Sequence, residues 1–466
     1  MASEHPTRED ADPDRYAGSR VYRWLDERLG LEDELLGKAF PEDRYGSFLL
    51  GEVALFSFVI LAATGTYLGL LYAPVATKDW TYAGQVAKYA GTQVPGAFGS
   101  VLRLTYDVRL GMYARMMHHW AAYFFVAAIA LHMFRVFFSG VYRNPREPNW
   151  LVGSTLLLLA LVEGFMGYAL PLDNFSKTAT SIGFEITGTI PVVGQFLTNL
   201  VFGGNFPQNA PYVLPRMFFY HVFLFPALIA GLIGVHLAIL LRHKHTEQEG
   251  ARTAVEADPD DDSVVVGVPL VPNQAALSLV VFLFTVAVIS FLAAMFPVQR
   301  IAIIGPETPF STPPNVSPDW FFMWAYGGLK LVPGSLGSFG RFIGGVVAPS
   351  LLIVAMYAWV FFDRSDVPVH FAENPLDRPL PTAVGIGAIV LILMLSIDGM
   401  NTYVANAFGT TTDALNTPLL VLTVLVPLVE AVAVYWLLAR RARRKGRETG
   451  TRRWVRTHVY SFYERD

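Results

Sequence analysis

The sequence has no cysteine, and charged residues make up only 16% of its 466 residues. Without cysteine, this chain cannot hold a disulfide, a cysteine-ligated iron–sulfur cluster or a haem attached through thioether bonds. A mean hydropathy of +0.40 together with the low charge is unlike that of a soluble protein, whose charged residues make up about a quarter of the chain. The composition therefore indicates a membrane protein.

The sequence contains several long runs of apolar residues. Eight of them are long enough to cross about 30 Å of hydrocarbon as helices. Helices are expected because every backbone polar group in lipid needs a partner within the chain. We therefore predict an all-α integral membrane protein. Its eight transmembrane helices should cover residues 47–72, 114–139, 150–170, 216–241, 275–296, 342–362, 382–399 and 418–439.

Basic residues are concentrated in the loops on one side of the predicted membrane. With eight spans, both termini lie on that side, and its segments hold 24 of the 35 lysine and arginine residues. Because basic loops are retained in the cytoplasm, we predict a multi-pass protein of a prokaryotic plasma (cell) membrane with both termini cytoplasmic. The basic tail also predicts contact with anionic membrane lipids.

The spans and the polar segments between them divide the chain into five parts. Apolar and charged residues alternate at helical spacing over residues 19–40, which predicts an amphipathic helix on the cytoplasmic surface, with an ordinary solvated helix as the alternative. The parts are a cytoplasmic-side segment at 1–45, a four-helix bundle at 46–242, an acidic linker at 243–273, a C-terminal four-helix half at 274–440 and a basic tail at 441–466.

The second predicted span contains three histidines, His118, His119 and His132. His118 and His132 are 14 residues apart. At about 100° per residue this spacing returns to within about 40° of the starting face, about 21 Å further along the helix. They therefore share a face, whereas His119 points away from it. The fourth span contains a matching couple, His221 and His236, which are 15 residues apart.

Pro226 lies between the two histidines of the fourth span and can kink the helix or admit a local bulge. Because spans two and four run in the same direction, the histidines form an outer pair, His118 and His221, and an inner pair, His132 and His236. Two facing histidines can ligate one haem iron axially, so the sequence predicts two non-covalent b-type haems stacked within the first four helices. The alternative for any single histidine is a polar contact in the helix core.

Small and basic residues support the haem prediction. Gly51 and Gly65 in the first span are also 14 residues apart, a spacing that would let two haem planes approach the backbone. Small-residue packing between membrane helices is the alternative. Arg115, Arg135 and Arg216 lie near the predicted haem levels, where they would pair with haem propionates or extend to the membrane interface.

With these features the sequence resembles the cytochrome b family, the membrane core of quinol-oxidising cytochrome bc and bf complexes. The resemblance covers nearly the whole chain and depends on the histidine and glycine pairs, GYALP at 167–171 and PDWF at 318–321. The amino-terminal half looks closer to the chloroplast and cyanobacterial branch, which divides the protein into two chains, whereas this chain is fused. Leu49 replaces the cysteine that attaches an extra haem in that branch, so a covalent third haem is ruled out and a non-covalent one is left open.

The resemblance implies an outer site at which quinol is oxidised. The family motif there usually reads Pro-Glu-Trp-Tyr, whereas this chain has a shorter carboxylate and lacks the tyrosine hydroxyl. The four residues are Pro318, Asp319, Trp320 and Phe321. A quinol hydroxyl needs a proton acceptor within hydrogen-bond reach, and Asp319 is the candidate. An aspartate that only caps the following helix is the alternative.

Five further residues are candidates around these sites. Tyr168 is the predicted second polar group of the outer site, and Phe165 and Met166 join Phe321 in an apolar wall for the quinone ring. Two carboxylates, Glu52 and Glu163, lie within spans, and Glu52 would supply protons to an inner quinone site. Hydrogen bonding to a neighbouring helix is the alternative for both carboxylates.

The resemblance also implies the function and the partners. One quinol electron would go to a Rieske-type iron–sulfur protein and on to a cytochrome c or blue-copper carrier. The other would cross the membrane through the two haems to an inner quinone, with proton translocation. A homodimer is implied, and no nucleic-acid partner is expected. Two other functions stay open: a haem b anchor of a molybdenum-type reductase, and a proton-coupled transporter without haem.

Overall fold

The computed structural model describes residues 49–204, 206, 210–243, 274–308, 317–365, 371–372 and 374–446. Within these residues, eight helical segments are long and apolar enough to cross a membrane, and each overlaps one predicted span. The predicted all-α fold with eight spans is therefore confirmed. The predicted amphipathic helix, nearly all of the acidic linker and most of the basic tail lie outside the described residues.

Two of the eight spans are composite helices in which a π-helical turn joins two α-helices. The fourth span is formed by α8 (Ala210–Phe219), the turn Tyr220–Leu224 and α9 (Phe225–His243), and the sixth by α14 (Gly337–Phe342), the turn Ile343–Val347 and α15 (Ala348–Phe362). The other spans are α2 (Leu50–Gly69), α4 (Gly111–Ser139), α5 (Glu147–Ala169), α11 (Ala275–Met295), α16 (Pro379–Gly399) and α18 (Thr412–Arg444).

Short elements connect the spans. Two strands, Trp80–Thr81 (β1) and Gln93–Val94 (β2), pair antiparallel with Trp80 opposite Val94. The short helices are α3 (Gly96–Tyr106), α6 (Asn174–Gly188), α7 (Gly194–Phe202), α12 (Ile301–Ile304), the 3₁₀ turn Trp320–Phe322, α13 (Met323–Leu331), the 3₁₀ turn Gly334–Leu336 and α17 (Asn401–Ala407).

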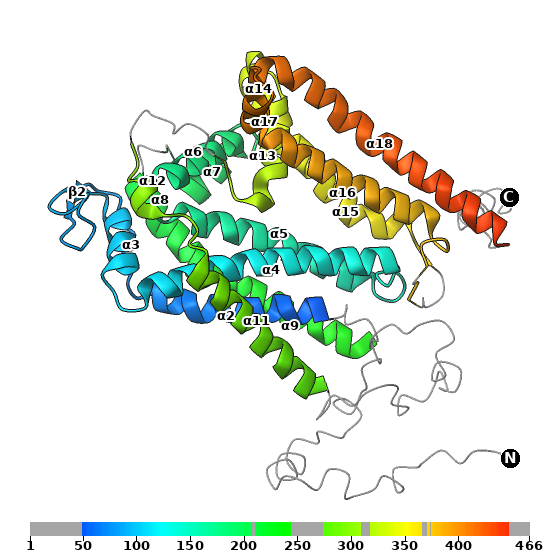
Figure 1. The fold of residues 1–466 in the computed structure, drawn as a ribbon, viewed down its shortest axis with the longest axis horizontal. Coiled ribbons are helices and arrows are strands. Elements are labelled where there is room, and N and C mark those ends of the chain that lie inside the picture. Colours follow the sequence, from blue (N-terminus) through cyan, green and yellow to red (C-terminus); the bar gives the residue numbers. More distant parts are fainter. Residues whose placement is uncertain are drawn as a thin grey trace, which may run out of the picture.

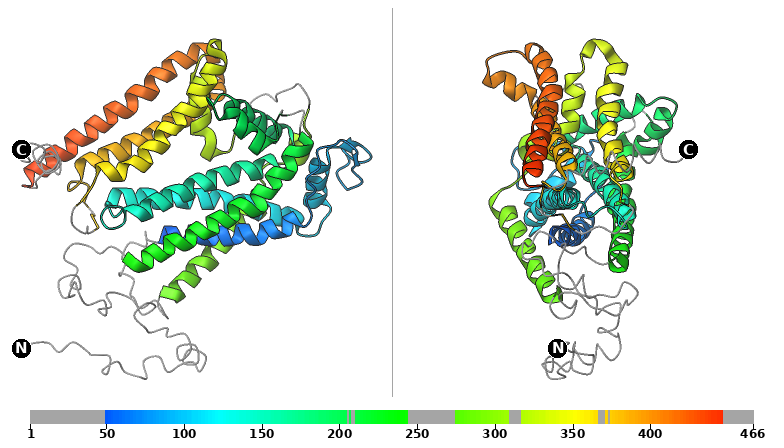
Figure 2. Two further views of the ribbon diagram at one scale, coloured as in Figure 1. Left: turned by 180° about the vertical axis from the view of Figure 1, so that it is seen from behind. Right: turned by 90° about the vertical axis from the view of Figure 1, so that its right-hand side faces the viewer.

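The first four spans lie in the middle of the molecule (Figure 1). On one side of them, α15 packs on α5 and α16 packs on α4, while α18 covers α16. On the other side, α11 packs against α2 and α4, away from the remaining helices of the C-terminal half (Figure 2). The later spans thus flank the central helices from two sides.

Short elements at one end of the central helices contact the chain that follows α11. There α3 and the β1–β2 hairpin project from the molecule (Figure 1). The side-chain amide of Asn174, at the start of α6, donates to the carbonyl of Ile304 at 3.3 Å. Its oxygen accepts from the backbone N–H of Thr308 at 2.8 Å. These bonds fix the chain that follows α11 against α6.

A π-helical turn explains the 15-residue spacing in the fourth span. The turn covers Tyr220–Leu224 and ends just before Pro226, which has no N–H to donate to the preceding turn. A π turn takes up about one residue more than an α turn. The π turn, which contains His221, therefore accommodates the extra residue. His236 then lies on the same face as His221 of the α8–α9 rod, as we call the composite helix of the fourth span.

A buried charged cluster fixes the opposite end of the central helices. The guanidinium of Arg378, which directly precedes α16, pairs with the carboxylate of Asp363 after α15. It also donates to the Tyr142 hydroxyl at 2.9 Å and to the carbonyl of Phe137 on α4 at 3.2 Å. Trp359 donates to the same hydroxyl at 2.6 Å. This network ties α4 to both C-terminal helices without leaving the Arg378 charge unpaired.

Candidate functional site

The structure brings the four histidines together in the two predicted couples. The ring centroids of His118 and His221 are 5.9 Å apart, with an interplanar angle of 81°. Those of His132 and His236 are 6.4 Å apart, with an angle of 76°. In each couple one ring comes from α4 and the other from the α8–α9 rod.

These separations fit a metal held between two imidazoles. A metal–nitrogen bond of about 2 Å on each side places the two ring centroids about 6 Å apart. In the described part of the chain, no group of three or more histidine, aspartate or glutamate side chains could hold a metal ion by itself. Each couple can supply two ligands, which is the number that a haem iron takes from the protein.

The hydrogen bonds of the outer pair engage the Nδ1 atom of each histidine and leave its Nε2 atom available for a metal. The Thr64 hydroxyl donates to the carbonyl of Ile60 at 2.6 Å, so it can only accept from the Nδ1 of His118, 3.0 Å away. The Nδ1 of His221 lies 2.8 Å from the Glu163 carboxylate. Because both Nδ1 atoms are engaged, both Nε2 atoms remain available to a metal.

Each histidine packs against a glycine of a neighbouring helix. A Cβ added at Gly65 would lie 3.1 Å from the ring of His118, and one at Gly167 would lie 2.5 Å from the ring of His221. The corresponding distances for the inner pair are longer, 3.4 Å from Gly51 to His132 and 3.5 Å from Gly153 to His236. A side chain at the two outer glycines would therefore displace a histidine.

Sequence reasoning missed the second glycine couple. Gly153 and Gly167 in α5 repeat the 14-residue spacing of the couple in α2. A search of every span for this period would have found them. Each of the four glycines faces one of the four histidine rings. This arrangement supports binding of two planar haems between the helices and is not explained by small-residue helix packing alone.

The three arginines predicted to meet propionates take different positions. Arg115 donates to the backbone carbonyl of Gln299 at 2.9 Å. Arg135 lies over the ring of Phe371, with its guanidinium carbon 3.8 Å from the ring centroid. Arg216 donates to backbone carbonyls at the end of α7, including that of Leu200 at 3.1 Å. Their pairing with propionates stays a prediction.

Asp319 does not act as a helix cap. It precedes the 3₁₀ turn Trp320–Phe322, and its side chain makes no cap hydrogen bond. Instead, its carboxylate accepts a hydrogen bond from the Tyr123 hydroxyl on α4 at 2.7 Å. The second carboxylate oxygen lies 3.9 Å from the Nε2 of His119, the histidine outside the two pairs. The capping alternative is therefore wrong, and Asp319 is held against the central helices.

Two neighbours of Asp319 were missed by sequence reasoning. Tyr123 follows His119 by four residues on α4 and therefore lies on the same face, which is a signal that the sequence contains. Gln299 places its side chain near both Asp319 and Tyr168. It has a positive φ of 42° in a loop whose path the sequence does not reveal. Tyr168 thus lies near Asp319, with Gln299 beside both.

Burial raises the pKa of the Asp319 carboxyl above its ordinary value, and the hydrogen bond from Tyr123 and the nearby Gln299 side chain oppose that shift. Burial disfavours the charged form, whereas donors that point at the carboxylate favour it. The group therefore has a greater tendency to hold a proton than an exposed aspartate. Such a carboxyl is suited to accept a proton from a buried hydroxyl near neutral pH.

Aromatic side chains surround this carboxylate. Phe321 is only 6% exposed, and its ring centroid lies 6.2 Å from that of Tyr123. Phe165 lies edge-on to Phe322 at 6.4 Å. Trp320, which follows Asp319 directly, is 48% exposed. These rings supply much of the predicted apolar wall.

Met166 and Pro318 occupy other positions near the predicted site. Met166 is buried in a cluster with Phe202, Val213 and Met217 of α7 and α8. Pro318 precedes Asp319 in the extended stretch before the 3₁₀ turn. Their contribution to a quinol site stays a prediction.

The two carboxylates within spans both bond to neighbouring helices. Glu52 on α2 accepts hydrogen bonds from Gln274 at 2.7 Å and from Ser278 at 2.9 Å. Ser278 lies on α11 and Gln274 directly precedes it, so these bonds join the two helices. Glu163 on α5 faces His221, as described above.

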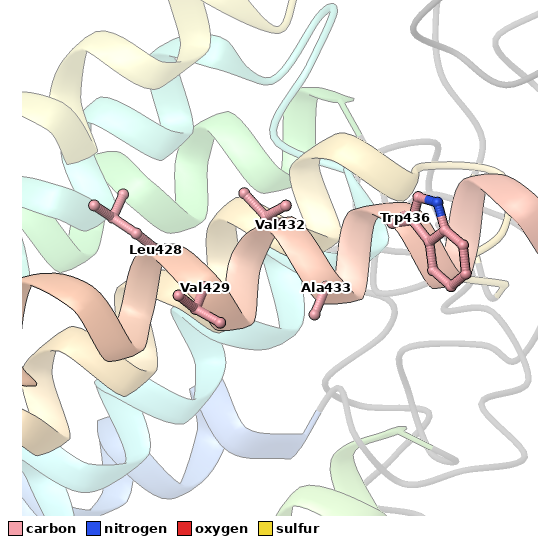
Figure 3. Close-up of a pocket in the computed structure, with 5 residues that line it drawn as sticks. All are labelled: Leu428, Val429, Val432, Ala433 and Trp436. Carbon is pink, nitrogen blue, oxygen red and sulfur yellow. The ribbon is translucent and has the colours of Figure 1, made fainter.

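A shallow apolar groove on α18 contains none of these groups. It is lined by Leu428, Val429, Val432, Ala433 and Trp436, all on one helix (Figure 3). It lies in a membrane-spanning helix and has no titratable or haem-ligating side chain. The candidate site is therefore between the central helices and not on this surface.

Comparison with known proteins agrees with the geometry. Residues 123–302 match the family model described as cytochrome b(N-terminal)/b6/petB, and residues 306–412 match cytochrome b(C-terminal)/b6/petD. A cytochrome bc1 complex cytochrome b subunit from Streptomyces coelicolor is 33% identical over 93% of this chain and 81% of that protein. The chain belongs to the cytochrome b family.

Other relatives and a solved structure agree. The cytochrome bc1 complex cytochrome b subunit of Mycobacterium tuberculosis is 36% identical over 81% of this chain and 69% of that protein. A chain of a hyperthermophilic respiratory Complex III has the same fold, with a TM-score of 0.64 and 22% identity over 88% of this chain and 99% of that chain. The predicted family and the predicted function as a quinol-oxidoreductase cytochrome b are confirmed.

Proposed function

We propose that this cytochrome b is the membrane subunit of a bc-type complex that binds two b-type haems and oxidises quinol beside Asp319. The observation that supports it best is the pair of histidine couples, with ring centroids 5.9 and 6.4 Å apart, each ring beside a glycine. His118 and His221 would hold the outer haem, and His132 and His236 the inner one. The haems, when bound, supply one-electron transfer across the bundle.

The chain's own residues would bind and deprotonate quinol. The aromatic rings of Phe321 and Phe165 would contact the quinol ring. Asp319 would accept a proton from a quinol hydroxyl, and its carboxylate is held for this role by the 2.7 Å hydrogen bond from Tyr123. Tyr168, which lies near Asp319, would orient the substrate.

The partners follow from the missing cysteines. Two electrons leave each quinol, and this chain offers only the haem route, so a Rieske-type iron–sulfur protein would accept the other electron. A cytochrome c or a blue-copper protein would then receive it. The proposed complex is a homodimer in the cell membrane with both termini in the cytoplasm. The named relatives from Streptomyces coelicolor and Mycobacterium tuberculosis are bc1 complex subunits, which supports this assembly.

A reduced-minus-oxidised absorption spectrum of the complex purified from native membranes tests the proposal. The expected result is two b-type haem components that quinol reduces, together with a copurified iron–sulfur subunit. A copurified molybdenum enzyme in place of that subunit would favour the reductase anchor. The absence of b-type bands would favour a proton-coupled transporter.

A further inference from the structure

We infer that Glu163 lowers the reduction potential of the outer haem by accepting a hydrogen bond from the Nδ1 of its axial ligand His221. The inference rests on the proposed function, because it requires a haem between His118 and His221. Glu163 would act through His221 and is therefore a positioning residue and not a catalytic one.

The contact between Glu163 and His221 is short, and α5 holds both Glu163 and the glycine that makes room for the histidine ring. The Glu163 Oε1 lies 2.8 Å from the Nδ1 of His221, and the Glu163 backbone carbonyl lies 3.3 Å from the same nitrogen. Gly167 lies one helical turn further along α5, where it admits the imidazole ring. One turn of α5 therefore provides both the space for His221 and the acceptor that orients it.

The Glu163 carboxylate is directed almost wholly at this histidine. Its side chain is only 16% exposed, and that of His221 is 17% exposed. Within the described residues, the second oxygen, Oε2, is buried and has no hydrogen-bond partner. A carboxylate placed in this way polarises the N–H bond of the imidazole and increases the electron donation of Nε2 to a bound metal.

Two of the other histidines, His118 and His236, have weaker acceptors. His118 faces the neutral hydroxyl of Thr64 at 3.0 Å. His236, in the inner pair, is turned toward the backbone of Asn149, and within the described residues its Nδ1 makes no hydrogen bond of normal geometry. The same helical rod thus presents one histidine with a carboxylate partner and one with a weak neutral partner.

This difference gives electron transfer a direction. Stronger donation from His221 stabilises the ferric state of the outer haem and lowers its potential. A haem held by His118 and His221 would accept one electron from quinol and pass it to a haem held by His132 and His236. A lower potential at the outer haem makes this second transfer favourable. Glu163 would therefore favour transfer away from the quinol site.

A redox titration of the purified complex tests the inference through the potentials of its two haems. In Glu163→Gln the side chain keeps its shape and a hydrogen-bond acceptor but loses the charge. We expect the equilibrium constant for reduction of the outer haem to rise at least tenfold, which is about 59 mV for one electron. The potential of the inner haem should not change. Glu163→Asp, which keeps the charge, should shift the outer haem less than Glu163→Gln does.

A matched variant distinguishes the effect of the Glu163 charge on the outer-haem potential from the effect of losing any hydrogen bond to a ligand histidine. Thr64→Val removes the neutral partner of His118 on the same haem, and we expect a smaller shift than that of Glu163→Gln. Unchanged potentials in Glu163→Gln, with both haems present, would overturn the inference. Equal shifts in the potentials of both haems would also overturn it. So would partial loss of the outer haem in which the outer haem that remains keeps its potential. Absence of b-type haem from the unmutated complex would instead contradict the proposed function.

Discussion

The outer and inner histidine pairs share one plan but differ in how tightly they are enclosed. Both pairs join α4 to the α8–α9 rod, and both lie between glycines of α2 and α5. A Cβ added at the outer glycines would lie closer to the histidine rings, at 2.5 and 3.1 Å, than one added at the inner glycines, at 3.5 and 3.4 Å. The outer pair also has a carboxylate partner in Glu163, 2.8 Å from His221.

The two ends of the bundle differ in a second respect. A buried carboxylate, Asp319, lies near the outer pair and bonds to Tyr123. At the other end, the partly buried Asp363 carboxylate is paired with Arg378, and this pair joins α15 to α16. A carboxylate without an arginine partner is free to exchange a proton, so the chemistry is expected at the outer end.

Removal of a ligand histidine should have the largest effect and should separate the two pairs. His221→Ala is expected to abolish the outer haem and leave the inner haem, and His236→Ala should do the reverse, because one imidazole cannot hold the iron axially from both sides. Haem content and difference spectra of the purified variants measure this. His119→Ala is the control and should retain both haems. Loss of a haem in that control, with retention in His118→Ala, would show that the pairing is wrong.

The unequal glycine distances predict unequal tolerance of a methyl group. Gly167→Ala places a Cβ 2.5 Å from the ring of His221, and we expect most of the outer haem to be lost. Gly153→Ala places its Cβ 3.5 Å from His236, an ordinary contact, and both haems should remain. Haem-to-protein ratios measure the difference. Equal losses in the two variants would mean that the outer pair is not the tighter one.

Asp319→Asn should slow quinol oxidation without affecting haem content. A positioned general base contributes a factor of about a hundred or more, so the turnover number is expected to fall by about that amount. Steady-state quinol oxidation, together with difference spectra, measures both properties. Asp363→Asn serves as a comparison at the other end, where instability is expected in place of a specific loss of turnover. Normal turnover in Asp319→Asn would remove this residue from the proposed mechanism.

Tyr123→Phe should have the smallest effect, a shift of the pH profile. Asp319 must be deprotonated to act as a base, so activity should rise with pH as the pKa of Asp319 is passed. Burial raises that pKa, and the Tyr123 hydrogen bond lowers it. Its loss should move the acid limb of the turnover profile to higher pH. An acid limb that stays in place would mean that Tyr123 does not stabilise the carboxylate.

The pattern of the helices was predictable because it depends on local composition. Apolar runs define the spans, and the 14-residue period of His118 and His132 follows from helical geometry. The π turn next to His221 was predictable only as a bulge near Pro226, because its position depends on packing against α5. Glu163 was identified as a candidate, but its partner could not be assigned, since nothing in the sequence sets the rotation of α5 against α9.

The surroundings of Asp319 were the least predictable part of the site. Tyr123 lies 196 residues away along the chain and approaches Asp319 only after α4 and the loop before α13 have packed together. Gln299 depends on a loop conformation with positive φ, which the hydrophobic pattern does not encode. Long-range contacts between irregular segments of this kind carry no periodic signal.

An experimental density map of the purified complex tests the central claim most directly. The account predicts one haem iron held between His118 and His221 and a second between His132 and His236, each bound through Nε2. Iron bound by His119 or by another side chain, or a density map in which either pair holds no haem, would contradict it.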